Sequence, residues 1–291
     1  MGVKAALAVL LLLASGLALP ACSPLRAFNA IVPKDGGTRL ALRDAAYGEH
    51  ARHKLDIYAP TGKTAAPRSE RRPMLVFIHG GSWASGDKSG YAFAGRAFAA
   101  QGFITAVPNY RLAPEGRYPG FLEDSAAAVK WLRANASRLG GDPDRIVLVG
   151  HSAGAYNAAM LALDERWLGA DKAAVKALIG LAGPYDFLPL DGPILEPAFG
   201  RPADPASTQP ITYAGAGDPP SLLLHGATDT TVRPQNALNL ARKLQAAGVQ
   251  AQAKTYPELG HVGIVTALAR PLRGGAPVLR DAAAFARAAT R

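Results

Sequence analysis

The sequence predicts an α/β fold in which a mostly parallel central sheet is flanked by helices. Short apolar runs, typical of strands that are buried on both faces, alternate with helical stretches along most of the 291 residues. These runs cover residues 74–78, 103–107, 145–149, 177–181 and 221–224. Internal repeats and a second core are not apparent. We therefore expect one domain over residues 38–291.

The remaining elements follow in chain order. Two N-terminal strands, over residues 38–46 and 52–58, are expected to pair antiparallel. A polar, proline-containing loop over 59–72 leads to the first buried strand. The predicted helices cover residues 91–100, 122–139, 153–163 and 235–247. A last strand over 250–256 and a last helix over 278–289 complete the domain.

The N-terminus resembles a targeting segment. Lys4 precedes an uninterrupted small and apolar run over residues 5–19. The run is shorter than the about 20 residues that a bilayer span needs, and it suits a signal peptide over residues 1–21. The run ends just before Cys22, the single cysteine of the chain, as in a bacterial lipoprotein signal whose cysteine is acylated.

We therefore expect export to the periplasm or outer membrane of a bacterium, with membrane attachment through lipidated Cys22 and a tether over residues 22–37. The alternative is an ordinary signal peptide beside an incidental cysteine. Because there is one thiol, the fold cannot depend on an internal disulfide.

The formal net charge of +10 is spread along the chain, and the densest basic stretch is residues 68–72. Nucleic-acid binding proteins usually cluster positive charge beside aromatic side chains. We therefore expect no nucleic-acid partner and interpret the charge as a general surface property. Attraction to an anionic envelope or an acidic polysaccharide is the alternative. Nothing in the sequence specifies an oligomeric state.

Polar residues of catalytic type follow four of the predicted strands. His79 comes after the first buried strand, Ser152 after residues 145–149, Asp229 after 221–224 and His261 after 250–256. Open parallel sheets place ligand sites at the carboxyl ends of their strands. These turns are therefore expected to converge on one edge of the sheet.

Ser152 is the candidate nucleophile. It lies in the G-x-S-x-G pattern of Gly150–Gly154, between an apolar strand and an alanine-rich helix. A sharp strand–turn–helix exposes such a serine at the sheet edge, and small flanking residues permit the turn. A glycine-rich turn with a capping serine is the alternative.

A serine hydroxyl needs a base to take its proton and an acid to orient that base. His261 is the candidate base, since Gly260 before it favours a flexible loop, whereas His225 at a strand end is interpreted as a shaping residue. Asp229 is the candidate acid because it follows a strand and precedes a helix. The carboxylates considered as rivals are Asp186, Asp218 and Glu258.

A tetrahedral intermediate also needs backbone donors for its oxyanion. The N–H of Ala153, directly after the nucleophile, is one expected donor. The glycines of the stretch His79 to Trp83 let the main chain approach closely, so the N–H groups of Gly81 and Ser82 are the others.

The segment 184–220 is rich in proline and contains several large apolar residues. It is expected to form a short lid or pocket wall, and the alternative is a buried satellite cluster. Trp83, Tyr185 and Phe187 are candidate pocket residues. Because the segment is short, we expect an open pocket that prefers short acyl chains.

Taken together, these motifs and Asn109–Pro114 (Asn-Tyr-Arg-Leu-Ala-Pro) resemble the α/β-hydrolase esterases. The resemblance is strongest to the H-G-G-x-W branch with hormone-sensitive-lipase-like carboxylesterases, feruloyl and acetyl-xylan esterases, and kynurenine formamidase. It implies a triad of Ser152, Asp229 and His261. Two positions depart from the usual pattern: Ser82 replaces a third glycine, and Ala227 stands where many relatives carry an extra aspartate.

The expected function is hydrolysis of a small-molecule or polysaccharide-linked carboxylic ester through an acyl-enzyme, without a cofactor or a metal. Formamide or amide hydrolysis and feruloyl or acetyl-xylan esterase activity are alternatives within enzymes. A non-catalytic envelope binding protein is the alternative from another class, and it predicts the loss of a triad member, whereas all three are present.

Overall fold

The computed structural model describes residues 24–61 and 71–291. The predicted signal peptide, Cys22 and most of the loop predicted over 59–72 lie outside these residues. Within the described part of the chain, no helix is long and apolar enough to cross a membrane.

An eight-stranded sheet forms the centre of the domain, with the order β1-β2-β4-β3-β5-β6-β7-β8. β1 pairs antiparallel with β2 and β2 with β4, while every other pair is parallel. This confirms the α/β-hydrolase type of sheet with antiparallel N-terminal strands. The strands are β1 Thr38–Ala46, β2 Lys54–Pro60, β3 Arg72–Ile78, β4 Ile104–Pro108, β5 Gly141–His151, β6 Val175–Leu181, β7 Ser221–Gly226 and β8 Ala251–Tyr256.

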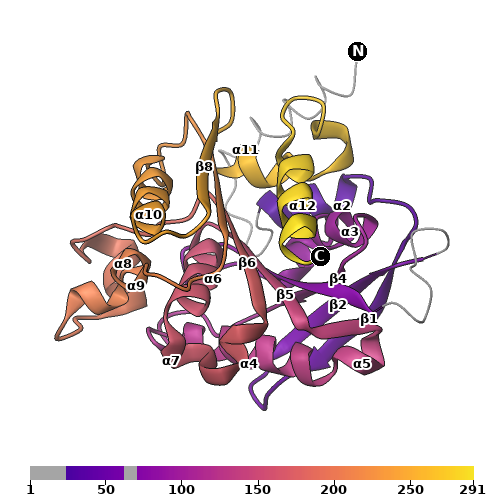
Figure 1. The fold of residues 1–291 in the computed structure, drawn as a ribbon, viewed down its shortest axis with the longest axis horizontal. Coiled ribbons are helices and arrows are strands. Elements are labelled where there is room, and N and C mark those ends of the chain that lie inside the picture. The colour runs from indigo at the N-terminus through magenta and orange to yellow at the C-terminus, as the bar shows by residue number, and fades with distance from the viewer. Residues whose placement is uncertain (1–23, 62–70) are drawn as a thin grey trace.

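The two faces of the sheet carry separate cores because side chains alternate along a strand. In β3, Met74, Val76 and Ile78 belong to one apolar cluster, and Leu75 and Phe77 belong to the other. The first cluster is covered by α4 Gly120–Ala134, α6 Ala153–Leu163 and α10 Gln235–Ala246. The second is covered by α3 Ala92–Ala100 and α12 Val278–Ala289 (Figure 1).

The helix predicted over 122–139 is two helices. α4 ends at Ala134, Asn135 has the non-helical angles φ −98° and ψ 4°, and α5 covers Ala136–Leu139. Gly140 then turns the chain with φ 79°, a conformation that glycine adopts without strain. A continuous helical pattern in the sequence does not reveal such a local change of direction.

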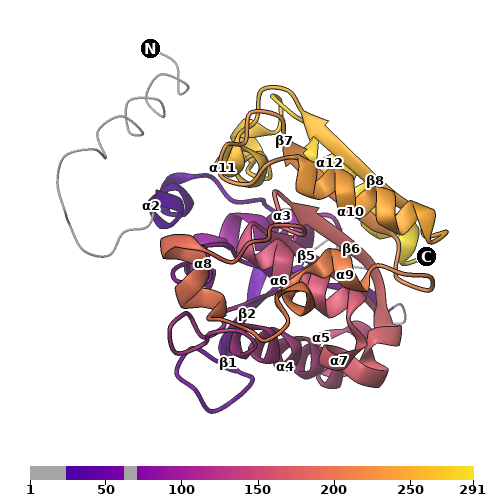
Figure 2. The same ribbon diagram turned by 90° about the vertical axis from the view of Figure 1, so that its left-hand side faces the viewer.

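Within the segment 22–37 that was expected to be a tether, residues 24–31 form helix α2 Pro24–Ile31. Asn29 fastens this helix to the domain: its amide donates to the Ser89 carbonyl at 2.7 Å, and its carbonyl oxygen accepts from the Phe93 N–H at 2.9 Å. The Phe28 ring packs edge-on against Phe93 at 5.2 Å. Figure 2 shows α2 at the periphery of the domain.

Several short helices were not predicted, because pieces this short carry no complete amphipathic pattern and depend on tertiary contacts. They are η3 Lys88–Gly90, α7 Glu165–Leu168, η4 Gly169–Ala174, α8 Gly192–Phe199, η5 Pro205–Thr208, α9 Pro210–Tyr213, α11 His261–Thr266 and η6 Arg270–Leu272.

Candidate active site

Ser152 stands at the corner between β5 and α6, with φ 54° and ψ −124°. A non-glycine residue in this region carries strain of about 1–3 kcal/mol. Its neighbours must be glycines: a Cβ at Gly150 would lie 2.1 Å from the Gly154 carbonyl oxygen, and one at Gly154 would lie 2.1 Å from that of Ile78. The G-x-S-x-G pattern is therefore a steric requirement of this turn.

The structure brings the three predicted triad residues together. Ser152 Oγ lies 2.8 Å from His261 Nε2, and Nδ1 of the same ring lies 2.8 Å from Asp229 Oδ2. Since an ionised carboxylate only accepts hydrogen bonds, Nδ1 carries the proton, and Nε2 is left as the acceptor for the serine hydroxyl. This is the arrangement that a general base next to a nucleophile requires.

Asp229 is buried and has hydrogen bonds at both carboxylate oxygens. Oδ1 accepts from the N–H groups of Thr231 and Val232, each at 2.9 Å. Burial by itself would raise the pKa of Asp229, but the bonds from Val232, His261 and Thr231 outweigh it and leave the pKa below its ordinary value. The carboxylate is therefore ionised and aimed at His261.

Two of the rival carboxylates, Asp186 and Asp218, have other partners. Asp186 accepts a hydrogen bond from Asn239 at 2.7 Å. Asp218 pairs with Lys172 at 2.9 Å and precedes β7, so it lies at the opposite edge of the sheet.

Two further histidines contact the triad. His151 Nε2 donates to the main-chain carbonyl of His261 at 2.9 Å, and burial lowers the His151 pKa to about 3, so the ring is neutral. His225 Nε2 lies 3.1 Å from Asp229 Oδ2. The sequence interpretation of His225 as a shaping residue missed this contact, although its position four residues before the candidate acid was a signal.

The predicted oxyanion loop lies against the serine turn. A Cβ at Gly80 would lie 2.8 Å from the His151 carbonyl oxygen, so this glycine permits the close approach. Gly81 and Ser82 adopt φ 125° and φ 53°. Within residues 24–61 and 71–291, no group accepts a hydrogen bond from the N–H of Gly81 or Ser82. The Ala153 N–H, at the first position of α6, has no intrahelical acceptor.

The Asn109–Pro114 motif contacts the oxyanion loop and the residues that follow it. The Asn109 side chain accepts from the Lys88 N–H at 2.6 Å and donates to Asp87 at 2.7 Å. The Tyr110 hydroxyl donates to the His79 carbonyl at 3.1 Å, and the two rings stack at 4.5 Å. Arg111 binds the buried carboxylate of Asp124 at 2.7 Å. The motif is therefore structural support for the oxyanion loop.

A pocket of about 540 Å³ opens beside Ser152. Residues of the predicted lid form one wall, and the segment after Asp229 forms another. Trp83 and Phe187 line it, with ring centroids 6.2 Å apart. The full lining is Ser82, Trp83, Ser152, Ala153, Pro184, Asp186, Phe187, Leu188, Pro189, Asp191, Pro193, Ile194, Leu195, Thr231, Val232, Arg233 and Asn236.

The assignment of Tyr185 to the pocket is wrong. Its side chain is fully buried, and its hydroxyl points at the sheet: a Cβ at Gly180 would lie 1.8 Å from the Tyr185 oxygen. The Tyr185 N–H also donates a hydrogen bond to the Asn236 side-chain oxygen at 2.8 Å. Glycine at position 180 leaves the space that the Tyr185 ring fills, whereas Phe187, two residues later, lines the pocket.

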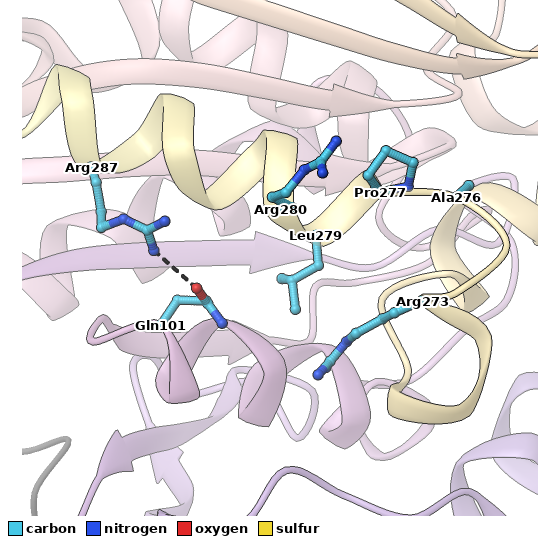
Figure 3. A pocket seen from close by; sticks show the side chains of 7 residues that line it. All are labelled: Gln101, Arg273, Ala276, Pro277, Leu279, Arg280 and Arg287. Atoms are coloured by element: carbon cyan, nitrogen blue, oxygen red, sulfur yellow. Dashed lines mark hydrogen bonds between the residues drawn. The ribbon is translucent and has the colours of Figure 1, made fainter.

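A second hollow lies between α3 and α12 and contains no candidate nucleophile or base. Figure 3 shows three arginines around it, with Arg287 donating to Gln101 at 2.9 Å. Arg273, at its other end, is paired with Asp35 at 2.6 Å. We therefore place the candidate active site at Ser152. In the described part of the chain, no group of three His, Cys, Asp or Glu side chains is placed to hold a metal ion.

This sheet order, with its sharp serine turn between β5 and α6, defines the protein as an α/β-hydrolase. Within that class the chain belongs to the BD-FAE family, whose sequence model matches residues 55–244. The solved structure of EstE1, a carboxylesterase cloned from a metagenomic library, superimposes with a TM-score of 0.74 at 23% identity, covering 92% of this chain and 94% of EstE1. At that identity the likeness shows the fold.

Sequence relatives carry esterase names. The isoprenylcysteine alpha-carbonyl methylesterase ICME of Arabidopsis thaliana is 28% identical over 82% of this chain and 60% of its own length. The esterase LipC of Mycobacterium tuberculosis is 29% identical over 70% of this chain and 55% of its own. The chain thus spans about three fifths of the length of the first curated relatives that it matches.

Proposed function

We propose that the protein hydrolyses carboxylic esters through an acyl-enzyme intermediate on Ser152. The observation that carries this proposal is the continuous chain of contacts from Ser152 Oγ through His261 to Asp229, each 2.8 Å long. Family membership and the esterase names of the relatives support an ester as substrate.

In the proposed mechanism His261 Nε2 removes the hydroxyl proton of Ser152, and Oγ attacks the ester carbonyl carbon. The carbonyl oxygen becomes an oxyanion, which the N–H groups of Ala153, Gly81 and Ser82 stabilise. When the tetrahedral intermediate collapses, His261 gives its proton to the departing alcohol. A water molecule, deprotonated by the same ring, then releases the acid and restores the serine.

A fluorophosphonate probe tests the nucleophile. The wild-type protein is expected to be labelled at Ser152, and Ser152→Ala is expected to abolish labelling and to lower kcat by about 10⁴–10⁶-fold. Ser137→Ala, at an exposed serine of α5, is the matched control and should label like the wild type. Labelling that persists in Ser152→Ala would overturn the proposal.

The open pocket supports a small ester with a short acyl chain, since one wall is a short segment with exposed Leu188 and Ile194. A p-nitrophenyl ester series measures this preference, and a best substrate longer than decanoyl would contradict it. Acetylated xylan, feruloyl esters and formylkynurenine, tested beside these esters, distinguish the polysaccharide-linked and formamide alternatives.

We further propose export to the periplasm or outer membrane and acylation at Cys22, on the basis of the apolar run and the cysteine that follows it. Growth of a bacterial host with an alkyne-tagged fatty acid should label the full-length protein and not Cys22→Ala. Equal labelling of both proteins would exclude acylation at this position.

A further inference from the structure

His225 is a fully buried histidine that the ester-cleaving steps above do not use. It stands near the end of β7, four residues before Asp229. Its Nε2 lies 2.8 Å from the Val232 carbonyl oxygen and 3.1 Å from Asp229 Oδ2. Both of these atoms are acceptors, so Nε2 carries a proton; it donates a hydrogen bond to the Val232 carbonyl and faces Asp229 Oδ2.

The other ring nitrogen identifies the charge state of His225. Among the described residues, nothing forms a hydrogen bond with His225 Nδ1. A protonated imidazole would bury an N–H there without an acceptor, which is costly. Burial also lowers the pKa of His225. The ring is therefore a neutral donor, and the negative charge of Asp229 is not cancelled by it.

Asp229 Oδ2 consequently lies against the rings of two histidines. His261 Nδ1 approaches at 2.8 Å from the start of α11, and His225 Nε2 at 3.1 Å from β7. The His261 side chain is 14% exposed and that of His225 is 0% exposed. The partly exposed His261 ring can take up and release a proton during turnover, whereas the buried His225 ring keeps its single proton.

We propose that His225 is a positioning residue, which holds the Asp229 carboxylate in line with His261 through the contact of its Nε2–H group with Oδ2. This inference rests on the proposed function. The backbone donors of Thr231 and Val232 fix Oδ1, and His225 fixes the rotation that directs Oδ2 at the base. The hydrogen bond of His225 to the Val232 carbonyl also links β7 to the turn that carries Asp229.

The titratable groups that face His225 are few. They are Asp229 in the following turn, His261 on α11, and His151 at the end of β5, each of which interacts electrostatically with the His225 ring or with one of its partners. His151 is neutral, as shown above, so the charge balance of this cluster is set by Asp229 and His261.

Two variants of full-length enzyme separate positioning from packing. His225→Leu fills the space but removes the donor, whereas His225→Gln retains an amide N–H near the place of Nε2. We expect His225→Leu to lower kcat by about 10–100-fold, the range for removing an N–H donor that faces a charged group, with KM nearly unchanged. His225→Gln should recover most of that loss.

The pH profile supplies a readout that packing alone would not move. A donor to Asp229 draws charge away from the carboxylate, so its loss strengthens the attraction between Asp229 and protonated His261. The acid limb of kcat/KM should therefore shift to higher pH in His225→Leu and remain in place in His225→Gln.

Equal kcat and equal acid limbs in the two variants would overturn the proposal. Failure of the proposed function is a separate result, because it would appear as an unlabelled or inactive wild-type protein. If His225→Leu unfolds, the comparison of His225→Gln with the wild type decides: a loss of kcat as large as that of Asp229→Ala would contradict the role of the Nε2–H donor.

Discussion

The His151 side chain, next to the candidate nucleophile, donates a hydrogen bond to the main-chain carbonyl of His261 at 2.9 Å. Residues 151 and 261 belong to β5 and α11, so this bond links the serine turn directly to the loop that carries the base. The two imidazole rings lie 5.1 Å apart. The distance between nucleophile and base is thus set by a side chain that takes no proton itself.

This relationship predicts the effect of His151→Leu. The variant leaves the His261 carbonyl without its donor and is expected to lower the free energy of unfolding by about 1–3 kcal/mol. It should also lower kcat, because the base is less well positioned. Denaturant unfolding and ester kinetics measure the two effects. His151→Gln, which retains a donor, should be less affected in both, and an unaltered kcat in His151→Leu would contradict the prediction.

A second prediction concerns the oxyanion loop. In Gly81→Ala, the new Cβ would lie 2.2 Å from the Ser85 carbonyl oxygen at φ 125°, so the loop must shift. We expect kcat to fall by about 10²–10³-fold, as for loss of an oxyanion donor.

Gly102→Ala is the matched control for this variant. Gly102 also has a positive φ, of 101°, but has open space around its Cβ position. Backbone strain alone should therefore destabilise Gly102→Ala without lowering its kcat. Equal kcat in the two variants would count against the assigned role of the loop.

The chain-length preference should depend on Phe187. This ring lines the pocket and is only partly buried, so Phe187→Ala enlarges the acyl space. We expect its best p-nitrophenyl ester to carry a longer acyl chain than that of the wild type. Leu190→Ala, on the same segment but outside the pocket lining, should leave the chain-length profile unchanged.

A fourth prediction concerns acid stability. Burial disfavours the charged form of Asp87, yet hydrogen bonds from Ser89 and Asn109 lower its pKa from 3.8 to about 2. Because the folded-state pKa is lower than the unfolded one, ionised Asp87 stabilises the protein above pH 3.8, and this contribution is lost as the pH falls through about 2.

The difference in unfolding free energy between wild type and Asp87→Asn should therefore shrink as the pH falls across this window. Denaturant titrations at a series of pH values measure it. A difference that stays constant with pH would show that Asp87 is not ionised in the native state, or that it is ionised without stabilising it.

The sequence by itself determined the alternation of buried strands and helices, and with it the edge of the sheet where Ser152, Asp229 and His261 were expected. It could do so because continuous apolar runs and glycine-flanked turns are local properties of the chain. The steric requirement for glycine at positions 150 and 154 follows from the same turn.

Only the tertiary structure decided which side chains meet. It directed Tyr185 into the core and Phe187 into the pocket, because the space left by Gly180 accepts the tyrosine ring. It converted part of the expected tether into helix α2 through contacts of Asn29 with residues about 60 positions away. It also brought the His151 side chain against the His261 main chain, since long-range packing, which carries no local sequence signal, sets that distance.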